Sequence, residues 1–295
     1  MAALALHWLG AGWEKVHVPI SGPEEFFAAA FAAANDGWGV GYRDPGIGAD
    51  YAIDHWDGSR WTVVPSPHLG GRGVLLGDVA ALGRNDAWAV GLDTPTPGVG
   101  KGRTLTEHWD GVHWKVVPTP DVGQSELEAV DAVTHNNVWA VGNHLGSTLI
   151  EHWDGRRWKV IPNPAARRGM LLGIDGASAD DVWVVGWYGS ERNMRPLLER
   201  WNGANWRRID LPGRRGFLVS VAVPSRRNVW VAGRHDPSGV FVEHRLGAKW
   251  RTARPPHFKK QRITSIAAAG NNDIWATGVI WNSGNFNSLI EHVRC

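Results

Sequence analysis

Short apolar stretches alternate with polar turns along the whole chain, and the same order of stretches recurs six times. Each unit predicts four strands: one of small apolar residues, one through Trp-Ala-Val-Gly or a close variant, one ending in Glu-His-Trp or a close variant, and one ending near Pro. The Trp of the second strand falls at Trp38, Trp88, Trp139, Trp183, Trp230 and Trp275, which lie 50, 51, 44, 47 and 45 residues apart. Repeats of roughly 40 to 50 residues with four short strands are typical of propeller blades. The sequence therefore predicts an all-β, six-bladed propeller with four antiparallel strands per blade.

Two turn signals support this division into strands. Asp-Gly or Asn-Gly lies between the third and fourth strands at Asp57-Gly58, Asp110-Gly111, Asp154-Gly155 and Asn202-Gly203. A two-residue hairpin turn needs residues that tolerate positive φ. Pro follows the fourth strand at Pro65, Pro118 and Pro162, which suits an outermost strand without a partner for every N–H.

The repeat fills the chain, so we predict a single propeller domain over residues 1–295. The expected blades cover residues 26–67, 74–120, 125–164, 170–212, 217–256 and 262–295, the last completed by residues 11–20. Residues 12–19 match a fourth strand with no first three before it, whereas the chain ends after a third strand. Both ends would therefore close the ring together and remove an open sheet edge. Residues 4–8 and 289–293 compete for the third strand of that blade, and the sequence leaves the choice open.

Composition adds a few expectations about class and location. The formal net charge of +2 demands no polyanionic partner, and no apolar run approaches the roughly 20 residues that span a bilayer. The first residues match the repeat and lack a basic segment, so we expect a cytoplasmic protein, or an extracellular one if a leader was removed. Cys295 is the single cysteine, so no intrachain disulfide is expected. We expect a monomer.

Most of the aromatic and acid–imidazole content follows the repeat. Of the 19 Trp, six fall in second strands, five in third strands and six in fourth strands, which predicts packing between blades. An acid followed by an imidazole recurs in the third strand at Asp54-His55, Glu107-His108, Glu151-His152, Glu243-His244 and Glu291-His292, with Glu199-Arg200 in the remaining unit. Adjacent strand residues point to opposite faces, so such a pair does not chelate one ion. We expect each His to bond the Asp or Asn that begins the second strand, at Asp36, Asp86, Asn137, Asp181, Asn228 or Asp273.

The units resemble the tectonin-like propeller repeats of bacterial and animal lectins. The match is carried by Val138-Trp139-Ala140-Val141 and by Trp153-Asp154-Gly155-Arg156-Arg157-Trp158, and these units are longer than the compact tectonin repeat. They are also similar to a group of bacterial propeller repeats with the Trp-Ala-Val-Gly and His-Trp-Asp-Gly pattern. The resemblance implies a propeller and, through the lectins, a glycan-binding function.

Loop lengths indicate where a site would lie. The separation from the second-strand Trp to the fourth-strand Trp of the same unit ranges from 19 to 26 residues. The separation from the fourth-strand Trp to the second-strand Trp of the next unit stays between 24 and 27 residues. The variation therefore belongs to the loop between strands two and three. That loop and the blade-to-blade connection share one end of each blade, the variable face, and irregular loops on a rigid scaffold commonly carry sites.

Different side chains follow the second strand in each unit, which favours one asymmetric pocket at the axial mouth of the variable face. The expected ligand-binding residues are Tyr42, Arg43, Trp187, Tyr188, Arg234, Asp236 and Trp281, and the expected catalytic residues are His144, His235, Asp131 and Glu128. Such a cleft suits a small-molecule ligand. If the protein is an enzyme, we expect cofactor-independent acid/base catalysis, as in a cyclase, lyase or hydrolase. Glycan binding at shallow sites between blades and ordinary surface loops are the alternatives.

Acids on the innermost strands raise the question of a cation. Asp131 and Asp175 occupy a position that is Ala in the other units, and Asp78 lies nearby, so these three are candidate metal ligands. Calcium is the hard cation they would take at the channel, while solvation by channel water is the simpler role. No cofactor is predicted.

Basic residues gather in the later blade-to-blade connections. They are Arg167, Arg168, Arg214, Arg215, Lys259, Lys260 and Arg262, and they would form a basic arc on the variable face. Without interleaved exposed aromatics, the arc predicts solubility rather than nucleic-acid binding.

Overall fold

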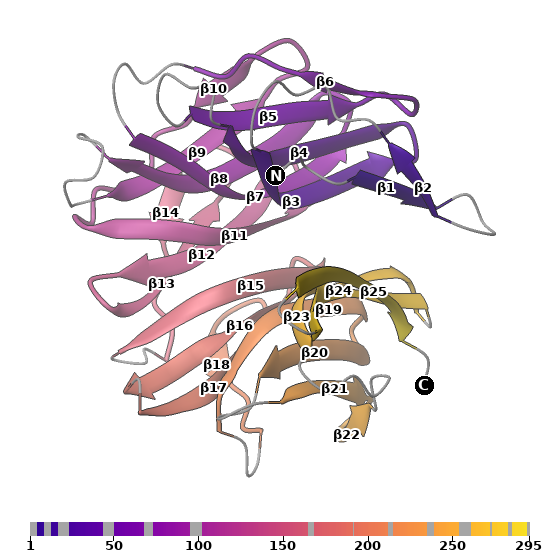
Figure 1. Cartoon of the computed structure of the whole chain (residues 1–295). Coiled ribbons are helices and arrows are strands. Elements are labelled where there is room, and N and C mark those ends of the chain that lie inside the picture. The colour runs from indigo at the N-terminus through magenta and orange to yellow at the C-terminus, as the bar shows by residue number, and fades with distance from the viewer. Residues whose placement is uncertain are drawn as a thin grey trace. The chain divides into compact units, whose positions relative to one another are not determined.

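The computed structural model describes most of the chain, and all the regular structure in the described residues is β-strand (Figure 1). The described residues are 5–8, 13–16, 24–43, 50–67, 73–94, 102–164, 168–190, 192–211, 215–234, 239–253, 261–271, 273–282 and 285–293. None of them forms a helix that is long and apolar enough to cross a membrane.

The strands fall into sheets that follow chain order. Blade 1 comprises β3 (Glu24–Ala33), β4 (Asp36–Arg43), β5 (Asp50–Trp56) and β6 (Trp61–Val63), and blade 2 comprises β7 (Gly73–Gly83), β8 (Asp86–Thr94), β9 (Arg103–Trp109) and β10 (Trp114–Val116). Blade 3 comprises β11 (Ser125–Thr134), β12 (Asn137–His144), β13 (Ser147–Trp153) and β14 (Trp158–Val160). Blade 4 comprises β15 (Gly169–Ser178), β16 (Asp181–Ser190), β17 (Asn193–Trp201) and β18 (Trp206–Arg208). Blade 5 comprises β19 (Phe217–Ser225), β20 (Asn228–Arg234), β21 (Val240–Leu246) and β22 (Lys249–Ala253), and blade 6 comprises β23 (Gln261–Gly270), β24 (Asp273–Asn282) and β25 (Asn285–Val293).

Each blade pairs its consecutive strands side by side in antiparallel fashion, as in Trp88 of β8 opposite Ala80 of β7 and His108 of β9. This is the six-bladed β-propeller that the repeat predicted. The chain divides into two compact units, one of Met1–Ala140 with His152–Lys159 and one of Val141–Glu151 with Val160–Cys295, so the division passes through blade 3. We describe each unit by itself.

The chain ends answer one of the questions that the sequence left open. The third strand of blade 6 is β25, which pairs with β24. The pairing runs from Ile274 opposite Val293 to Asn282 opposite Asn285. The early segment forms a separate two-stranded sheet, in which β1 (Ala5–Trp8) pairs with β2 (Trp13–Val16). Residues 289–293 therefore hold the contested place, and closure of the ring by residues 11–20 stays a prediction.

The second-strand Trp forms the contact between blades in the first unit. Trp88 is 1% exposed, and its ring centroid lies 5.1 Å from that of Trp153 and 5.3 Å from that of Trp158, both in the next blade. Trp38 repeats the arrangement with Trp109 at 4.9 Å and Trp114 at 5.0 Å. The edge-to-face geometry with the fourth-strand Trp is one that aromatic pairs prefer. The expected packing role of the repeated Trp is confirmed here.

The second unit builds its core in the same way. Trp183 packs among Leu198, Leu218, Val231 and Phe241, which come from β17, β19, β20 and β21. A further cluster joins Trp230 of blade 5 to buried side chains of blade 6. Each blade thus buries the face that it cannot bury alone against its neighbour.

The third-to-fourth strand turns show why Asp-Gly recurs. The glycines have φ of 96° at Gly58, 93° at Gly111, 87° at Gly155 and 91° at Gly203, the left-handed region that favours Gly. The preceding acid or amide caps the turn, since Asp110 Oδ1 accepts hydrogen bonds from the backbone N–H of Val112 (3.0 Å) and His113 (2.8 Å). A Cβ at Gly111 would meet Asn85, in the turn between strands one and two. The two kinds of turn therefore share one end of the blade, here called the turn face.

Replacing Trp139 with Ala should lower the free energy of unfolding by about 3 to 5 kcal/mol, the usual cost of truncating a buried Trp. The side chain is 1% exposed and its ring lies 4.1 Å from the His152 ring, so the truncation would leave a cavity. Urea unfolding followed by Trp fluorescence and circular dichroism would measure the loss. Val112→Ala is the control, since Val112 is 67% exposed and should change stability by less than about 0.5 kcal/mol. Equal stability of the two variants would contradict the packing role.

Candidate functional site

The recurrent imidazole makes a structural hydrogen bond in five of the six blades. His Nε2 lies 2.7 or 2.8 Å from the Oδ1 atom that begins the second strand, in the pairs His55–Asp36, His108–Asp86, His152–Asn137, His244–Asn228 and His292–Asp273. In blade 4, Arg200 Nε donates to Asp181 Oδ1 at 2.6 Å. The ring also stacks on the second-strand Trp, with centroids 3.9 Å apart for Trp230 and His244. The predicted structural hydrogen bond is confirmed.

The acid beside each imidazole points to the opposite side of the strand and is buried. Glu107 Oε2 accepts a hydrogen bond from Ser66 Oγ (2.5 Å), and Glu199 Oε2 accepts one from Asn163 Nδ2 (2.8 Å). Each donor belongs to the connection that leaves the preceding blade. Burial raises the pKa of both Glu107 and Glu199 to about 7, against an ordinary value of 4.5, although these hydrogen bonds act to lower it. The acids tie one blade to the next.

Two of the three inner acids proposed as metal ligands have a backbone role. Asp78 accepts hydrogen bonds from the N–H of Val79 and from the N–H of Val130 on the next blade, each at 2.9 Å. Asp175 does the same with Gly176 (2.9 Å) and Val223 (2.6 Å). Desolvation raises the pKa of both carboxyls, to about 7 for Asp78. These contacts differ from the solvated or calcium-binding role that the sequence predicted for them.

The remaining inner acids lie on β11. Asp131 is partly buried, and Glu128 lies three residues before it. Desolvation raises the pKa of the Glu128 carboxyl to about 7, and the negative charge of Glu126 adds to the rise. Strand residues two apart face the same side, so Glu126 and Glu128 are neighbours. Glu128 can therefore hold or release a proton near neutral pH.

The predicted axial residues lie at the variable-face ends of the second strands. His144 ends β12, Arg234 ends β20, and Trp187 and Tyr188 lie late in β16; all four are partly buried. Tyr42 and Arg43 end β4 and Trp281 lies near the end of β24, but their side chains fall outside the described part of the structure, as do His235 and Asp236 entirely. Tyr188 is engaged within its own blade, where the Arg208 guanidinium carbon lies 3.6 Å from the centroid of its ring. Of the expected residues, Glu128 and Asp131 belong to the first unit, and His144, Trp187, Tyr188 and Arg234 belong to the second. A shared axial pocket stays a prediction.

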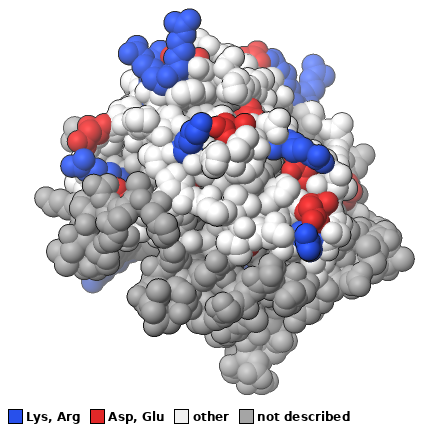
Figure 2. Space-filling model, turned by 90° about the horizontal axis from the view of Figure 1, so that it is seen from above, with Lys and Arg blue, Asp and Glu red and all other residues white. Residues whose placement is uncertain are grey.

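Several exposed charges in the described part of the chain form ion pairs. Figure 2 shows basic and acidic side chains next to one another, separated by uncharged surface. Such ion pairs include Lys115–Asp110 and Lys159–Asp154, each with 2.5 Å between nitrogen and oxygen. Of the predicted basic arc, Arg168, Arg215 and Arg262 are described and exposed, and the arc itself stays a prediction.

A groove of about 340 Å³ lies at the variable-face end of blade 2. Its walls are the end of β8, the first half of β9, the end of β10 and the connection to β11. The lining residues are Asp93, Arg103, Thr104, Leu105, Thr106, Val116, Val117, Pro118, Thr119, Pro120, Asp121, Val122, Gly123 and Ser125. All of them belong to the first unit. The groove is open, and its wall alternates hydroxyl, carboxyl and guanidinium groups with Leu, Val and Pro.

Hydrogen bonds fix the connection against β9. The hydroxyls of Thr104 and Thr119 lie 2.8 Å apart, and Ser125 Oγ accepts from the N–H of Thr104 (3.3 Å) while donating to the carbonyl of Gly123 (3.0 Å). The N–H of Gly123 in turn donates to Asp121 Oδ1 at 3.0 Å. The groove wall is therefore held by its own backbone and hydroxyl groups before any ligand arrives.

Charged side chains lie on both sides of the mouth of this groove. Asp93 and Arg103 face each other as the last pair of β8 and β9, and Arg103 Nη1 lies 3.6 Å from Asp121 Oδ2. Both members of the latter pair are exposed, so water weakens their attraction and leaves them free to exchange partners. The groove thus offers donors and acceptors over a small apolar floor.

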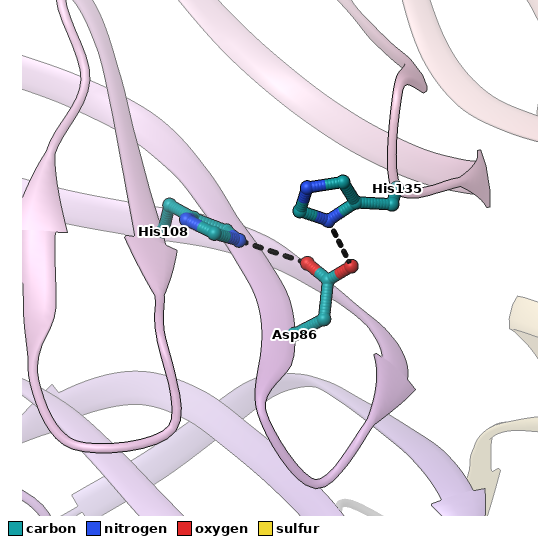
Figure 3. A group of neighbouring side chains, drawn as sticks. All are labelled: Asp86, His108 and His135. Atoms are coloured by element: carbon teal, nitrogen blue, oxygen red, sulfur yellow. Dashed lines mark hydrogen bonds and ion pairs between the residues drawn. The ribbon is translucent and has the colours of Figure 1, made fainter. Parts of the chain in front are cut away.

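A second polar group lies on the turn face of the same unit (Figure 3). The carboxylate of Asp86 accepts from two imidazoles: His108 Nε2 lies 2.8 Å from Oδ1, and His135 Nδ1 lies 2.7 Å from Oδ2. The ligand atoms of the three residues all lie within 4.8 Å of one another. Asp86 and His108 belong to blade 2, while His135 lies in the turn between β11 and β12 of blade 3.

Comparison with known proteins bears on the fold. No protein-family model and no curated protein matches the chain. Solved structures match it over nearly its whole length. YCF48 bound to D1 peptide is 18% identical, with 97% of this chain and 83% of that chain covered and a TM-score of 0.63. YCF48 from Cyanidioschyzon merolae is 14% identical, with 96% and 88% covered and a TM-score of 0.59. SapL1 lectin in complex with alpha methyl fucoside is 13% identical, with 93% and 97% covered and a TM-score of 0.56.

The shared feature is the propeller fold. At these identities the likeness extends to the path of the chain and not to individual site residues. Of these structures, one has a peptide bound and another has alpha methyl fucoside bound.

The sequence predicted neither the groove of blade 2 nor the cluster of Asp86, His108 and His135. The groove depends on how residues 117–125 fold back on β9, which no repeat predicts. His135 did carry a signal, because the residue two places before the acid or amide of strand two is Ala34, Arg84, His135, Ala179, Arg226 and Asn271 across the six units. An imidazole occurs there once, opposite a carboxylate of the preceding blade.

The raised pKa of Glu107 predicts a pH-dependent stability difference. Folding raises this pKa from 4.5 to about 7, so the folded protein keeps a proton that the unfolded chain releases. The stabilisation that this bound proton gives to the folded state is complete below pH 4.5 and is lost as the pH rises through about 7. Glu107→Gln stays neutral at every pH, so the unfolding free energy of the variant relative to wild type should rise by about 2 to 3 kcal/mol between pH 5 and pH 8. Urea unfolding at the two pH values measures it.

Asp57→Asn provides the control for this measurement. Hydrogen bonds from Ser59 and Arg60 lower the pKa of the exposed Asp57 to about 2, so it is ionised in both states above pH 5. Its effect on stability should be the same at pH 5 and pH 8. If Glu107→Gln behaves in the same pH-independent way, the Glu107 carboxyl is not protonated in the fold.

Proposed function

We propose that this chain is a ligand-binding propeller whose blade 2 groove takes a hydroxyl-rich small molecule, such as one sugar unit of a glycan. The observation that carries the proposal is the groove itself: about 340 Å³, open to solvent, and lined by alternating polar and apolar groups. Small-molecule sites usually have volumes of roughly 300 to 1,000 Å³ and combine an apolar surface with a few placed polar groups. The groove is at the small end of that range.

The chemistry of the wall suits hydroxyl groups. A sugar hydroxyl both donates and accepts, and the groove offers acceptors in Asp93 and Asp121, donors in Arg103, and hydroxyls that do either. The partly exposed side chains of Val116 and Val122 would pack against the C–H faces of the ring. An ion pair of exposed residues gives way to such a ligand at little cost, because it is weak in water.

The wall is also held in advance of binding. Pro118 and Pro120 flank Thr119 and fix the backbone φ on both sides of it, while the Thr119 hydroxyl is anchored to Thr104. A wall that is ordered before binding loses less conformational entropy when the ligand arrives. The tectonin-like repeat pattern and the likeness to the SapL1 lectin propeller support a sugar as the ligand class.

The described lining favours binding over catalysis at this groove. It contains no His, Cys or Lys among its described residues, and its hydroxyls bond one another or the backbone. A nucleophilic hydroxyl would need a base within hydrogen-bond reach. The carboxylates of Asp93 and Asp121 are assigned here to the recognition of ligand hydroxyls, so we propose binding as the role of the groove.

The axial pocket is the second candidate, with a small molecule as its ligand and acid/base chemistry as its reaction. It is supported by Glu128, an inner-strand carboxyl whose pKa is raised to about 7 by burial and by Glu126. A general acid or base works best with a pKa near the operating pH. The sequence assigned His144, His235, Trp187 and Tyr188 to the same pocket, and that assignment stays a prediction.

Arg103→Ala tests the groove. Native mass spectrometry against mixed mono- and oligosaccharides should show one ligand per chain, and the variant should bind it at least about 10-fold more weakly, since a hydrogen bond to a charged group contributes about 1.5 to 3 kcal/mol. Arg60→Ala is the matched control, because Arg60 is also exposed, is also paired with an Asp and lies outside the groove. The control should bind as wild type does.

Other outcomes separate the candidates. Binding that survives Arg103→Ala but is lost when His144 and His235 are both changed to Ala would overturn the groove and favour the axial pocket. Several equivalent sugars per chain would indicate repeated sites between blades. Binding of extended peptides but not sugars would overturn the ligand class, as the peptide-bound YCF48 structure makes worth testing.

A further inference from the structure

His135 sets the turn face of blade 2 apart from the corresponding sites in the other blades. In every blade the second-strand acid or amide bonds the third-strand imidazole or guanidinium of its own blade. At Asp86 the next blade adds a second imidazole, which bonds the other carboxylate oxygen. At the matching position of the next two units the sequence has Ala179 and Arg226, and Arg226 pairs with Asp180 of blade 4. The repeat therefore does not require an imidazole here.

From this arrangement we propose that Asp86, His108 and His135 bind one divalent transition-metal ion of the Zn²⁺ class. Two imidazoles and one carboxylate are a donor set that Zn²⁺ takes in proteins, with bonds of about 2.0 to 2.2 Å. Nitrogen donors favour such ions over calcium, which takes oxygen. The site is independent of the groove and of the proposed sugar ligand.

The distances suit a tetrahedral ion after a small adjustment. Donor atoms around such an ion lie about 3.3 Å apart. Here the two imidazole–carboxylate distances are 2.8 and 2.7 Å, and the three ligand atoms all lie within 4.8 Å of one another. The metal would enter between the rings and the carboxylate and would replace the protons that now bridge them. The mobile member is His135, whose side chain is 67% exposed.

The other two ligands are held by the fold. Asp86 and His108 have side chains 18% and 20% exposed, and the His108 ring lies 4.4 Å from the buried Trp88 ring. Two side chains that are held in place in this way lose little conformational entropy when a metal ion binds to them. The exposed side of His135 leaves the fourth position to water. Bound metal would link the second and third strands of blade 2 to the first turn of blade 3.

Cobalt provides a direct probe of the site. Co²⁺ added to the purified full chain should give the visible d–d absorption of a tetrahedral complex at one equivalent per chain, and Zn²⁺ should displace it. His135→Ala should weaken Co²⁺ and Zn²⁺ binding more than about 100-fold, because loss of an outer-shell partner alone costs about 10- to 100-fold. The variant should fold, since the repeat itself places Ala34 and Ala179 at this position.

Asp86→Asn is the sharper variant. Asn137 and Asn228 show that an amide oxygen accepts the same imidazole hydrogen bond, at 2.7 and 2.8 Å. The change should therefore keep the blade intact while replacing an anionic ligand with a neutral one, and metal binding should fall by a similar factor. His113→Ala is the matched control, an exposed imidazole on the turn between β9 and β10 of the same blade.

The outcomes are distinct. Stoichiometric tetrahedral Co²⁺ that is lost in both variants and retained in His113→Ala supports the site. Binding of equal strength in wild type and His135→Ala, or weak octahedral binding at several sites, would overturn it and leave a hydrogen-bonded imidazole–carboxylate–imidazole group. Thermal unfolding gives a second measurement: Zn²⁺ at 100 times its Kd should raise the Tm of wild type by about 4 °C and leave that of Asp86→Asn unchanged.

Discussion

The fold depends on a sheet of four short strands that cannot bury its own faces. In the first unit, the second strands of blades 1 and 2 place a Trp on the face toward the next blade, where the ring is enclosed by the Trp residues of that blade's third and fourth strands, as Trp88 is by Trp153 and Trp158. Since this contact accounts for the apolar area that a single blade exposes, stability comes from neighbouring blades in pairs. Within the blade, an imidazole lies against the Trp ring, as His108 does against Trp88, and in blade 4 the Arg200 guanidinium takes this place on Trp183.

Polar ties run in parallel with this apolar contact. The buried acid of one third strand accepts a hydrogen bond from the connection that leaves the preceding blade, and inner acids such as Asp78 accept backbone N–H groups across the same boundary. Burial raises the pKa of these carboxyls because the charged form loses its water, so near neutral pH they can hold a proton without chemistry being involved. A raised pKa in this fold is therefore weak evidence for catalysis on its own.

The repeat explains what could be predicted from the sequence. A residue that returns in every unit has the same neighbours in every unit, so the Trp packing, the Asp-Gly turns and the imidazole–acid pairs all followed from their spacing. The inner acids show the limit, because Asp78 and Asp175 break the repeat and their partners are backbone groups of another blade, which side-chain spacing does not reveal. The groove was missed for a related reason: residues 117–125 take their path from hydrogen bonds to β9, such as the contact between Ser125 and the N–H of Thr104.

Departures from the repeat are therefore the positions where function is to be sought, provided that their partners are known. Thr119 and Ser125 shape a groove, and His135 places a second imidazole on a carboxylate that elsewhere needs one. By contrast, Glu107 and Glu199 have similarly raised pKa values but occupy a recurring position with a recurring partner. Because each recurring imidazole already bonds the second-strand acid or amide of its own blade, a polar side chain outside the repeat is the one that can be selected for a ligand. On this argument His135 carries more information about function than any of the imidazoles that the repeat requires.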